Sequence, residues 1–231
     1  MEIHGIQKLT LLDYPGHTAC TVFTGHCNFR CPFCHNASLV LRPDSQPTVE
    51  PEELFALLRK RRGLLDGVCI TGGEPTLQKD LAQLCESIKS LGFLVKLDTN
   101  GSNPALLASL LERGLVDYVA MDIKSSREHY DRLCGIIHYD TARVEESAEL
   151  LIHGKVSYEF RTTLIRELHE RSDMEAIGQW LKGAKAYFLQ GFRDSGDLIG
   201  SGFSALDNEE METYANILRL YIENTHVRGA E

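Results

Sequence analysis

Three cysteines lie close together near the N-terminus, with a spacing suited to metal chemistry. Cys27, Cys31 and Cys34 follow the pattern CxxxCxxC within the segment GHCNFRCPFCHN. Three thiolates at this spacing can bind three of the four irons of a cubane 4Fe–4S cluster. The fourth iron then has no protein ligand, and an open coordination position is typical of a metal site that performs chemistry. The spacing therefore predicts a catalytic iron–sulfur centre.

Other metal sites could use the same cysteines. A structural zinc site would need His35 as its fourth ligand, but adjacent Cys34 and His35 fit a tetrahedron poorly. An electron-transfer cluster would need a distant fourth ligand such as Cys69, whereas ferredoxin-like segments supply all four cysteines in a recognisable spacing. Accidental clustering of buried thiols is the third alternative. The open cluster is favoured among these four.

The elements that must position the cysteines alternate along the chain. Short apolar runs predict strands buried on both faces at Cys20–Thr24, Val68–Thr71, Leu94–Thr99, Tyr118–Ile123, Ser157–Thr163 and Lys185–Gln190. Helical patterns predict helices near 51–62, 79–91, 104–113, 141–152, 173–182 and 208–223. This repeated alternation predicts an α/β fold with a parallel sheet and right-handed crossovers.

The length of the chain limits how far this sheet can close. Eight strand–helix units form a closed TIM-type barrel of about 250 residues, and 231 residues leave room for six. We therefore expect one domain, residues 1–231, built as a partial (βα)6 barrel with the sheet open on one side. Its core would span about 18–191, followed by a loop and helix at 192–231. The open side could admit a bulky substrate, including a segment of another protein.

Polar and glycine-rich residues follow the predicted strands. In parallel α/β folds the active site forms at the C-terminal ends of the strands, so these residues should share one rim. They are Cys27, Gly72-Gly73-Glu74-Pro75, Asp98-Thr99-Asn100-Gly101, Asp122 with Lys124, Arg161, and Gln190-Gly191. The rim is thus the predicted active site.

Composition excludes several classes of function. The net charge of −9 disfavours general binding to nucleic acid, because like charges repel at long range. No apolar run approaches the roughly 20 residues that cross a bilayer, and the first residues lack a signal-peptide pattern. We therefore expect a cytoplasmic protein that binds neither nucleic acid nor membrane. The basic run at Arg59–Arg62 suits the end of a solvated helix, or less readily a docking patch for an acidic electron donor.

The combined motifs resemble a known family. CxxxCxFC followed by GGEP after the second strand resembles the radical S-adenosylmethionine (SAM) superfamily. The fuller segment FTGHCNFRCPFCHN, with DTNG and MDIK further on, resembles the glycyl-radical-enzyme activating enzymes. The leader GIQKLTLLDYPG is most similar to the activating proteins of anaerobic ribonucleoside-triphosphate reductase.

The resemblance implies roles for the residues on the rim. The amino and carboxylate groups of SAM would chelate the open iron, with Gly72, Gly73, Glu74 and Pro75 near the amino group. Phe33 would contact the adenine, and Gln190 the ribose or adenine. Asp98 and Asp122 end adjacent strands and could lie close together, with Lys124 as a compensating cation. Asp98, Thr99 and Asp122 also match the residues near a monovalent cation in related activases. Arg161 suits the SAM carboxylate, a partner backbone or a structural ion pair, while His26 and His35 could tune the cluster or only donate hydrogen bonds.

The resemblance also implies a reaction and its partners. An external electron donor, a flavodoxin or ferredoxin, would reduce the cluster, and cleavage of SAM would give methionine and a 5′-deoxyadenosyl radical. That radical would abstract hydrogen from a glycine of a partner glycyl radical enzyme. A radical SAM enzyme acting on a small molecule, similar to the 7-carboxy-7-deazaguanine synthases, is the alternative within the superfamily. A zinc-stabilised binding module is the alternative outside it.

Overall fold

The protein is described by a computed structural model over residues 2–229, which fall into two compact units. The first unit contains residues 2–28 and 36–120, and the second contains 29–35 and 121–229. The cysteine segment is divided between them, with Cys27 in the first unit and Cys31 and Cys34 in the second. Each unit is described separately below.

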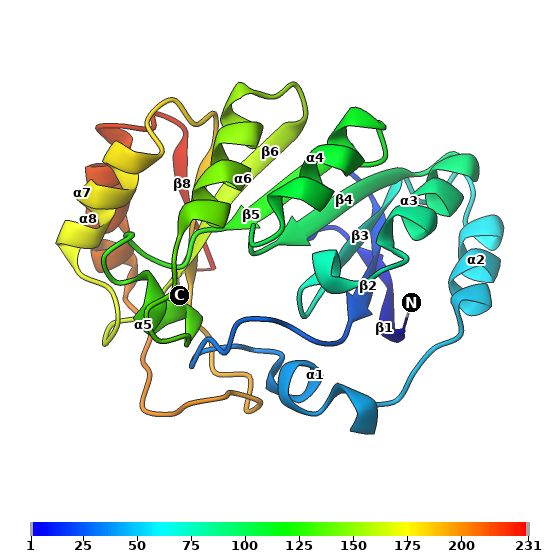
Figure 1. Ribbon diagram of the computed structural model, residues 1–231, viewed down its shortest axis with the longest axis horizontal. Helices are drawn as coiled ribbons and strands as arrows, with labels where there is room; N and C mark the ends of the chain where they lie inside the picture. Colours follow the sequence, from blue (N-terminus) through cyan, green and yellow to red (C-terminus); the bar gives the residue numbers. More distant parts are fainter. Residues whose placement is uncertain (1, 230–231) are drawn as a thin grey trace. The chain divides into compact units, whose positions relative to one another are not determined.

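The sheet of the first unit has four strands in chain order. Strand β1 (Ile3–Thr10) pairs antiparallel with β2 (Ala19–Thr24), and β2, β3 (Gly67–Gly72) and β4 (Leu94–Thr99) are parallel. Helices α2 and α3 pack against β1 and β4, respectively (Figure 1). The helical segments of this unit are α1 (Ala37–Leu41), η1 (Pro43–Ser45), α2 (Pro51–Lys60), η2 (Pro75–Leu77), α3 (Leu81–Ser90) and α4 (Pro104–Glu112).

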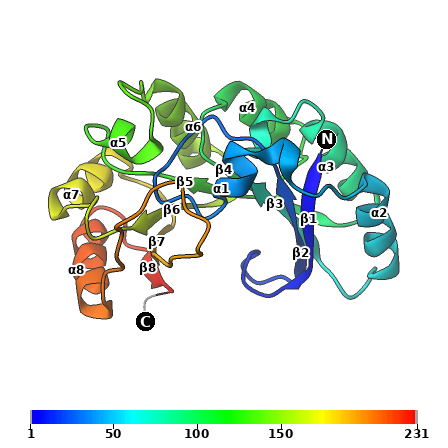
Figure 2. The ribbon, with the colours of Figure 1, turned by 90° about the horizontal axis from the view of Figure 1, so that it is seen from below.

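Strand β5 (Tyr118–Asp122) carries the chain into the second unit, whose sheet is parallel. Its strands β6 (Ser157–Leu164), β7 (Tyr187–Gly191) and β8 (Thr225–Arg228) follow chain order. Helices α7 and α8 lie side by side, and α8 packs against β7 and β8 (Figure 2). The helices of this unit are α5 (Tyr130–Cys134), α6 (Ala142–His153), α7 (Arg171–Trp180) and α8 (Asn208–Arg219).

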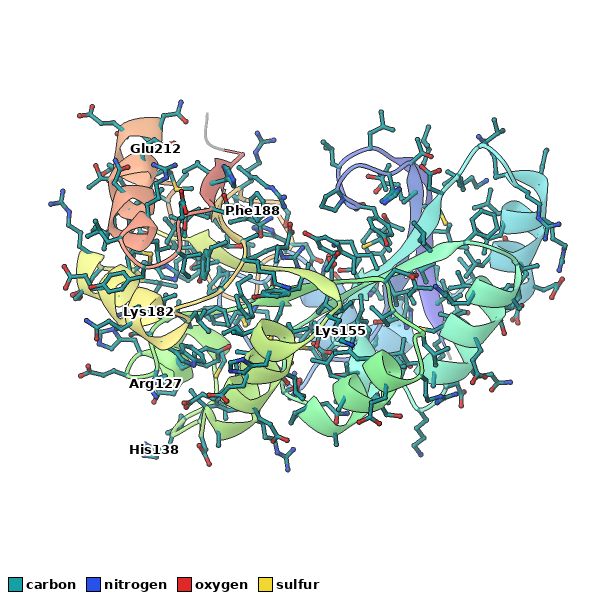
Figure 3. The ribbon with its side chains drawn as sticks, turned by 90° about the horizontal axis from the view of Figure 1, so that it is seen from above. Arg127, His138, Lys155, Lys182, Phe188 and Glu212 are labelled. Atoms are coloured by element: carbon teal, nitrogen blue, oxygen red, sulfur yellow. The ribbon has the colours of Figure 1, made fainter. Side chains whose placement is uncertain are left out.

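Local sequence explains several of these elements. Helix α4 begins as its sequence predicts, with Asn103 Oδ1 accepting a hydrogen bond from the N–H of Leu106 at 3.3 Å and Pro104 in the first turn. Helix α8 begins with a capping box between Asp207 and Glu210. Glu212 of α8 is exposed on the outer side of this helix (Figure 3). On β7, the ring of Phe188 packs against the guanidinium of Arg228, with 3.3 Å between the ring centroid and Cζ. Amphipathic helices therefore cover one side of largely apolar strands.

The predicted fold class is confirmed, with two strands added. All six predicted strands are present, the strands are mostly parallel, and among the described residues β1 and β8 each pair with a single neighbouring strand, so the sheet is not closed. The prediction missed β1 and β8, and it also missed the short helices α1 and α5. Strand β1 is half exposed and polar in its middle, and β8 has only four residues, so neither gives a long apolar run.

Two smaller expectations can also be compared with the structure. The basic run does end helix α2, where exposed Arg59 pairs with Glu52. The last predicted helix is shorter than expected, since α8 ends at Arg219 and a turn leads into β8. Among residues 2–229, no helix is both long and apolar enough to cross a membrane.

Candidate active site

The glycine-rich loop after β3 packs directly on the loop that leads to Cys27. The N–H of Gly73 donates to the carbonyl of Thr24, and the N–H of Glu74 donates to the carbonyl of His26, both at 2.8 Å. A Cβ on Gly73 would lie 1.9 Å from the His26 oxygen, and one on Gly72, whose φ is +112°, would lie 2.4 Å from the Thr24 oxygen. Both glycines are therefore required by the contact between these two loops.

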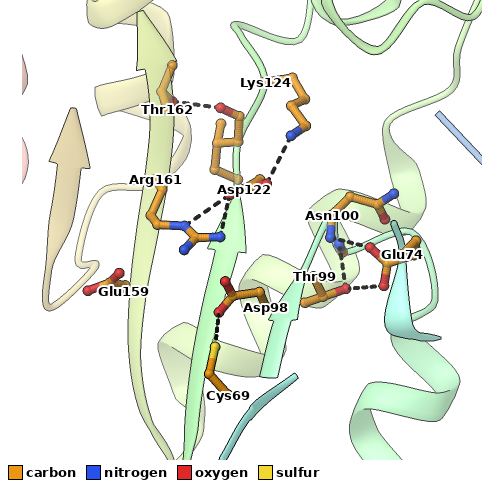
Figure 4. A network of polar contacts seen from close by, with 12 residues as sticks. Cys69, Glu74, Asp98, Thr99, Asn100, Asp122, Lys124, Glu159, Arg161 and Thr162 are labelled. Atoms are coloured by element: carbon orange, nitrogen blue, oxygen red, sulfur yellow. Dashed lines mark hydrogen bonds and ion pairs between the residues drawn. The ribbon is translucent and has the colours of Figure 1, made fainter. Parts of the chain in front are cut away.

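The carboxylate of Glu74 is buried and saturated with hydrogen bonds. Its Oε1 accepts from the N–H of Thr76 at 3.0 Å, from the Thr76 hydroxyl at 2.6 Å and from the Thr99 hydroxyl at 2.8 Å. Its Oε2 accepts from the N–H of Asn100 at 2.6 Å (Figure 4). Burial raises the pKa of Glu74, and these hydrogen bonds oppose the rise. The side chain thus fastens the loop after β3 to the end of β4, while Pro75 begins the short helix η2.

Asn100, to which the sequence analysis gave no role, links the same network to Cys27. Its Nδ2 lies 3.8 Å from Cys27 Sγ and donates to Asn28 Oδ1 at 2.9 Å. Its Oδ1 accepts from the N–H of Ser102, and the Asn28 amide donates to the Ser102 hydroxyl, both at 2.9 Å. A side-chain donor is therefore held against the Cys27 sulfur, an arrangement that favours a thiolate. The DTNG motif, in which Asp98 and Thr99 have predicted roles, also contains Asn100 and was the available signal.

Asp98 is neutralised from its own strand. Lys96, whose side chain is 2% exposed, forms an ion pair with Asp98, and Cys69 Sγ lies 3.7 Å from Asp98 Oδ1 (Figure 4). Lys96 Nζ also lies 3.7 Å from the Cys69 sulfur. The compensating cation of Asp98 within the first unit is thus Lys96, which the sequence analysis missed. Cys69 is fully buried in this cluster.

Asp122 of the second unit has two cationic partners. Lys124 Nζ lies 2.9 Å from Asp122 Oδ2, and the Arg161 guanidinium contacts Asp122 Oδ1 at 2.9 and 3.0 Å (Figure 4). Burial would raise the pKa of Asp122, but the two neighbouring cations lower it to about 2. Asp122 is therefore ionised at neutral pH. The structure places Arg161 in the ion pair that was one of its three predicted roles.

The other two cysteines belong to a turn that packs on the C-terminal part of the chain. The N–H of Cys34 donates to the carbonyl of Cys31 at 3.0 Å, and the N–H of Gly200 donates to the carbonyl of Pro32 at 2.6 Å. Cys31 and Phe33 are buried, and Cys34 is partly exposed. The segment that follows β7 therefore supports the turn on which two of the cysteines lie.

The remaining predicted residues occupy neighbouring positions in their units. Burial lowers the pKa of His35, whose ring lies 5.5 Å from that of Phe192 between centroids. The half-exposed His26 belongs to the loop before Cys27. Gln190 lies on β7, in register with Thr163 of β6 and Arg228 of β8. Gln190 thus lies near the C-terminal end of β7.

The cysteine chemistry fits an iron–sulfur cluster. No disulfide occurs in the described residues. Cys20, Cys69, Cys85 and Cys134 are fully buried in strands or helices, and burial raises the pKa of Cys20 to about 11 and of Cys85 to about 12. Such thiols are poor metal ligands, because the thiolate is the form that binds. The three cysteines of the CxxxCxxC segment lie instead in loops, as a ligand set for three irons requires.

Comparison with known sequences assigns the chain to a family. The sequence profile of the radical SAM superfamily matches residues 21–181. A Methanocaldococcus jannaschii protein, provisionally named a glycyl-radical enzyme activating enzyme, is 31% identical over 239 aligned positions. The alignment covers 98% of this chain and 95% of that protein.

Solved structures share the fold at low sequence identity. Streptococcus suis SuiB, solved with its precursor peptide SuiA, has a TM-score of 0.72 and 14% identity over 90% of this chain, which spans about half (48%) of SuiB. A domain of the pyruvate-formate lyase-activating enzyme from Bacteroides vulgatus has a TM-score of 0.58 and 16% identity, covering 71% of this chain and 99% of that domain. The partial-barrel fold, the cysteine segment and the sequence profile agree: the chain is a radical SAM enzyme, a member of the superfamily that uses a 4Fe–4S cluster and S-adenosylmethionine.

Proposed function

We propose that this enzyme is an activase that forms a glycyl radical in a partner enzyme, and that the partner is anaerobic ribonucleoside-triphosphate reductase. The observation that carries the proposal is the similarity to the M. jannaschii protein, which extends over nearly the whole of both chains. The leader GIQKLTLLDYPG supports the choice of partner. When bound, the reduced cluster and SAM supply a 5′-deoxyadenosyl radical, the species that removes hydrogen from the glycine.

The cysteines and the loop after β3 are the proposed cofactor ligands. Cys27, Cys31 and Cys34 hold three irons and leave the fourth for the amino acid end of SAM. The amino group of SAM is held by carbonyl oxygens of the loop Gly72–Pro75. We assign this contact to carbonyls because all four donors around the Glu74 carboxylate come from the protein itself. Glu74 then acts by holding the loop in position.

The charged strand ends are proposed to orient the rest of SAM. Asp98, Thr99 and Asp122 form a site for a monovalent cation near the SAM carboxylate, with Lys124 and Arg161 limiting the negative charge of Asp122. Carboxylate and hydroxyl oxygens suit a hard cation, which prefers oxygen ligands. Phe33 is the proposed adenine contact, and Gln190 the proposed contact for ribose or adenine.

The electron is proposed to come from a separate protein, a flavodoxin or ferredoxin. Among residues 2–229, the cysteines outside the CxxxCxxC segment are single and buried, so they offer no ligand set for a second cluster. The enzyme therefore needs an external reductant that can approach the first cluster.

Electron paramagnetic resonance tests the proposal. The anaerobically reconstituted enzyme is mixed with SAM, dithionite and purified anaerobic ribonucleotide reductase, and we expect a glycine-centred doublet in the reductase. Cys34→Ala should abolish the doublet, whereas Cys134→Ala, which alters a buried thiol of α5, should preserve it. Methionine and 5′-deoxyadenosine released without a doublet in the reductase or in any other glycyl radical enzyme would contradict the activase assignment and favour a small-molecule substrate.

A further inference from the structure

A second group of metal-ligating side chains, which includes none of the three cysteines, lies in the first unit. One ligand atom each from Glu2, His26 and Asp44 lies within 4.8 Å of the other two. His26 Nε2 is 3.8 Å from Asp44 Oδ1, and His4 Nε2 is 3.9 Å from Glu2 Oε2. These residues come from the start of β1, the loop after β2 and η1. The group of three therefore contains one imidazole and two carboxylates, and His4 adjoins it through its contact with Glu2.

His4 provides independent evidence for a ligand. Its side chain is 0% exposed, yet its Nε2 has no hydrogen-bond partner. Its Nδ1 lies 3.2 Å from the carbonyl oxygen of Pro47, which can only accept, so Nδ1 carries the hydrogen. In the neutral ring the lone pair is then on the buried Nε2. Metal-binding histidines have this arrangement, with one nitrogen donating to a backbone carbonyl and the other bound to the metal.

Contacts with neighbouring segments set the backbone positions of both histidines. A Cβ on Gly25 would lie 2.5 Å from His4 Nε2 and 3.0 Å from Pro43 Cβ, so the His4 ring packs directly against the chain at residue 25. His26 has a φ of +61°, which is uncommon for a residue other than glycine. Its N–H donates to the carbonyl of Leu39 at 2.9 Å, and its carbonyl accepts from the N–H of Glu74. Both histidines therefore start from positions set by the fold.

We propose that Glu2, His4, His26 and Asp44 bind a divalent transition-metal ion of the zinc class. Imidazole nitrogens and carboxylate oxygens suit Zn²⁺, and two carboxylates balance its charge. Bonds of about 2.0–2.2 Å in a tetrahedron place ligand atoms about 3.4 Å apart. The His26–Asp44 and His4–Glu2 gaps of 3.8 and 3.9 Å must therefore close by about half an ångström, and the other gaps among Glu2, His26 and Asp44, which lie within 4.8 Å, by up to about 1.4 Å. The carboxylates can make this movement, because the Glu2 and Asp44 side chains are 62% and 88% exposed.

The ion would join β1 to the loop that leads into Cys27. His26 immediately precedes Cys27, and its carbonyl receives the hydrogen bond from the loop after β3. A metal ion that links His26 to the start of β1 and to η1 would therefore restrain the backbone on which Cys27 lies. The site contains no thiolate and is chemically distinct from the cysteine ligands.

Zinc binding to the cluster-loaded enzyme tests this proposal. Equilibrium dialysis against Zn²⁺ is performed anaerobically with iron quantified before and after, so that Cys27, Cys31 and Cys34 remain occupied. We expect one zinc per chain, and zinc X-ray absorption with nitrogen and oxygen neighbours but no sulfur near 2.3 Å. His4→Gln and His26→Gln should each weaken binding by about 10-fold or more.

A matched control and a second variant keep the result decisive. His17 lies 3.9 Å from Asp66 as an isolated histidine–carboxylate pair, so His17→Gln should leave zinc binding unchanged. Asp44→Asn changes an exposed side chain and should weaken binding even if a variant of buried His4 fails to fold. The absence of stoichiometric zinc, a sulfur neighbour in the absorption spectrum, or equal binding by Asp44→Asn and wild type would overturn the proposal.

Discussion

Glu74→Gln should loosen the loop that we assign to SAM. The carboxylate accepts from two backbone N–H groups, those of Thr76 on Oε1 and Asn100 on Oε2, which cannot reverse their roles. Glutamine has the same shape, but in either orientation its NH₂ group must face one of these donors. One buried N–H and part of the new amide are then unsatisfied, at a cost of about 1–3 kcal/mol each. The expected destabilisation is therefore about 2–6 kcal/mol.

Thermal unfolding followed by circular dichroism measures this loss. For a protein of this size, about 2–4 °C of melting temperature corresponds to each kcal/mol, so Glu74→Gln should melt about 4–24 °C below wild type. Glu86→Gln is the control, since Glu86 pairs with Arg113 on an exposed surface and should change stability by about 0.5 kcal/mol or less. The dissociation constant for SAM should rise in Glu74→Gln alone. Equal melting temperatures for the two variants would refute the argument that Glu74 fastens the loop.

Three further perturbations test the charged groups near the strand ends. Asp122→Asn should destabilise the protein by about 1–2 kcal/mol at pH 6, allowing for partial exposure. The pKa of Asp122 in the folded protein is lowered to about 2, so the difference in urea-unfolding free energy between variant and wild type should vanish as the pH falls from about 4 to about 2. A difference that persisted at pH 2 would refute this prediction. Lys96→Met removes the ion pair between Lys96 and the buried Asp98 and should lower the free energy of unfolding in urea by about 3–5 kcal/mol. The double variant with Asp98→Leu should recover this stability. An unchanged stability of the single variant would contradict the prediction. Asn100→Leu removes the donor near Cys27 Sγ and should make the cluster potential about 40 mV more negative in a redox titration, whereas an unchanged potential would argue against that hydrogen bond.

The strands that carry the site were predictable because they are buried on both faces. Leu94–Thr99 was predicted with its observed bounds, and Cys20–Thr24 differs from β2 by one residue. Continuous apolar runs bounded by turn residues give a strong signal in such sheets. Strand β1 was missed because only Ile3 and Thr10 at its ends are fully buried. Between these two residues the sequence HGIQKL has only two apolar side chains, which are not adjacent, so it gives no continuous apolar run.

The polar partners were harder to predict, for two different reasons. Lys96 lies two residues before Asp98, so their side chains point to the same face of β4, and a lysine in an apolar strand was a usable signal. Glu74, by contrast, bonds to Thr99 and Asn100, which are 25 and 26 residues away on another strand. The sequence places Glu74 after one strand and Thr99 and Asn100 at the end of the next, but the hydrogen bonds between them depend on how the two segments pack. Tertiary packing decides that pairing.

The hydrogen bonds of the first unit connect Cys27 to the loop proposed for SAM by two routes. One runs through the backbone, from the carbonyl of His26 to the N–H of Glu74. The other runs through Asn100. Its backbone N–H donates to the Glu74 carboxylate, and its side-chain amide donates to the Cys27 sulfur. Because the two routes close a ring that includes β2, β3 and β4, displacement of either loop must strain at least one buried hydrogen bond. The spacing between Cys27 and the glycine-rich loop is therefore set by three neighbouring strands. Gly72 and Gly73, which have no room for a Cβ, occupy the point of contact.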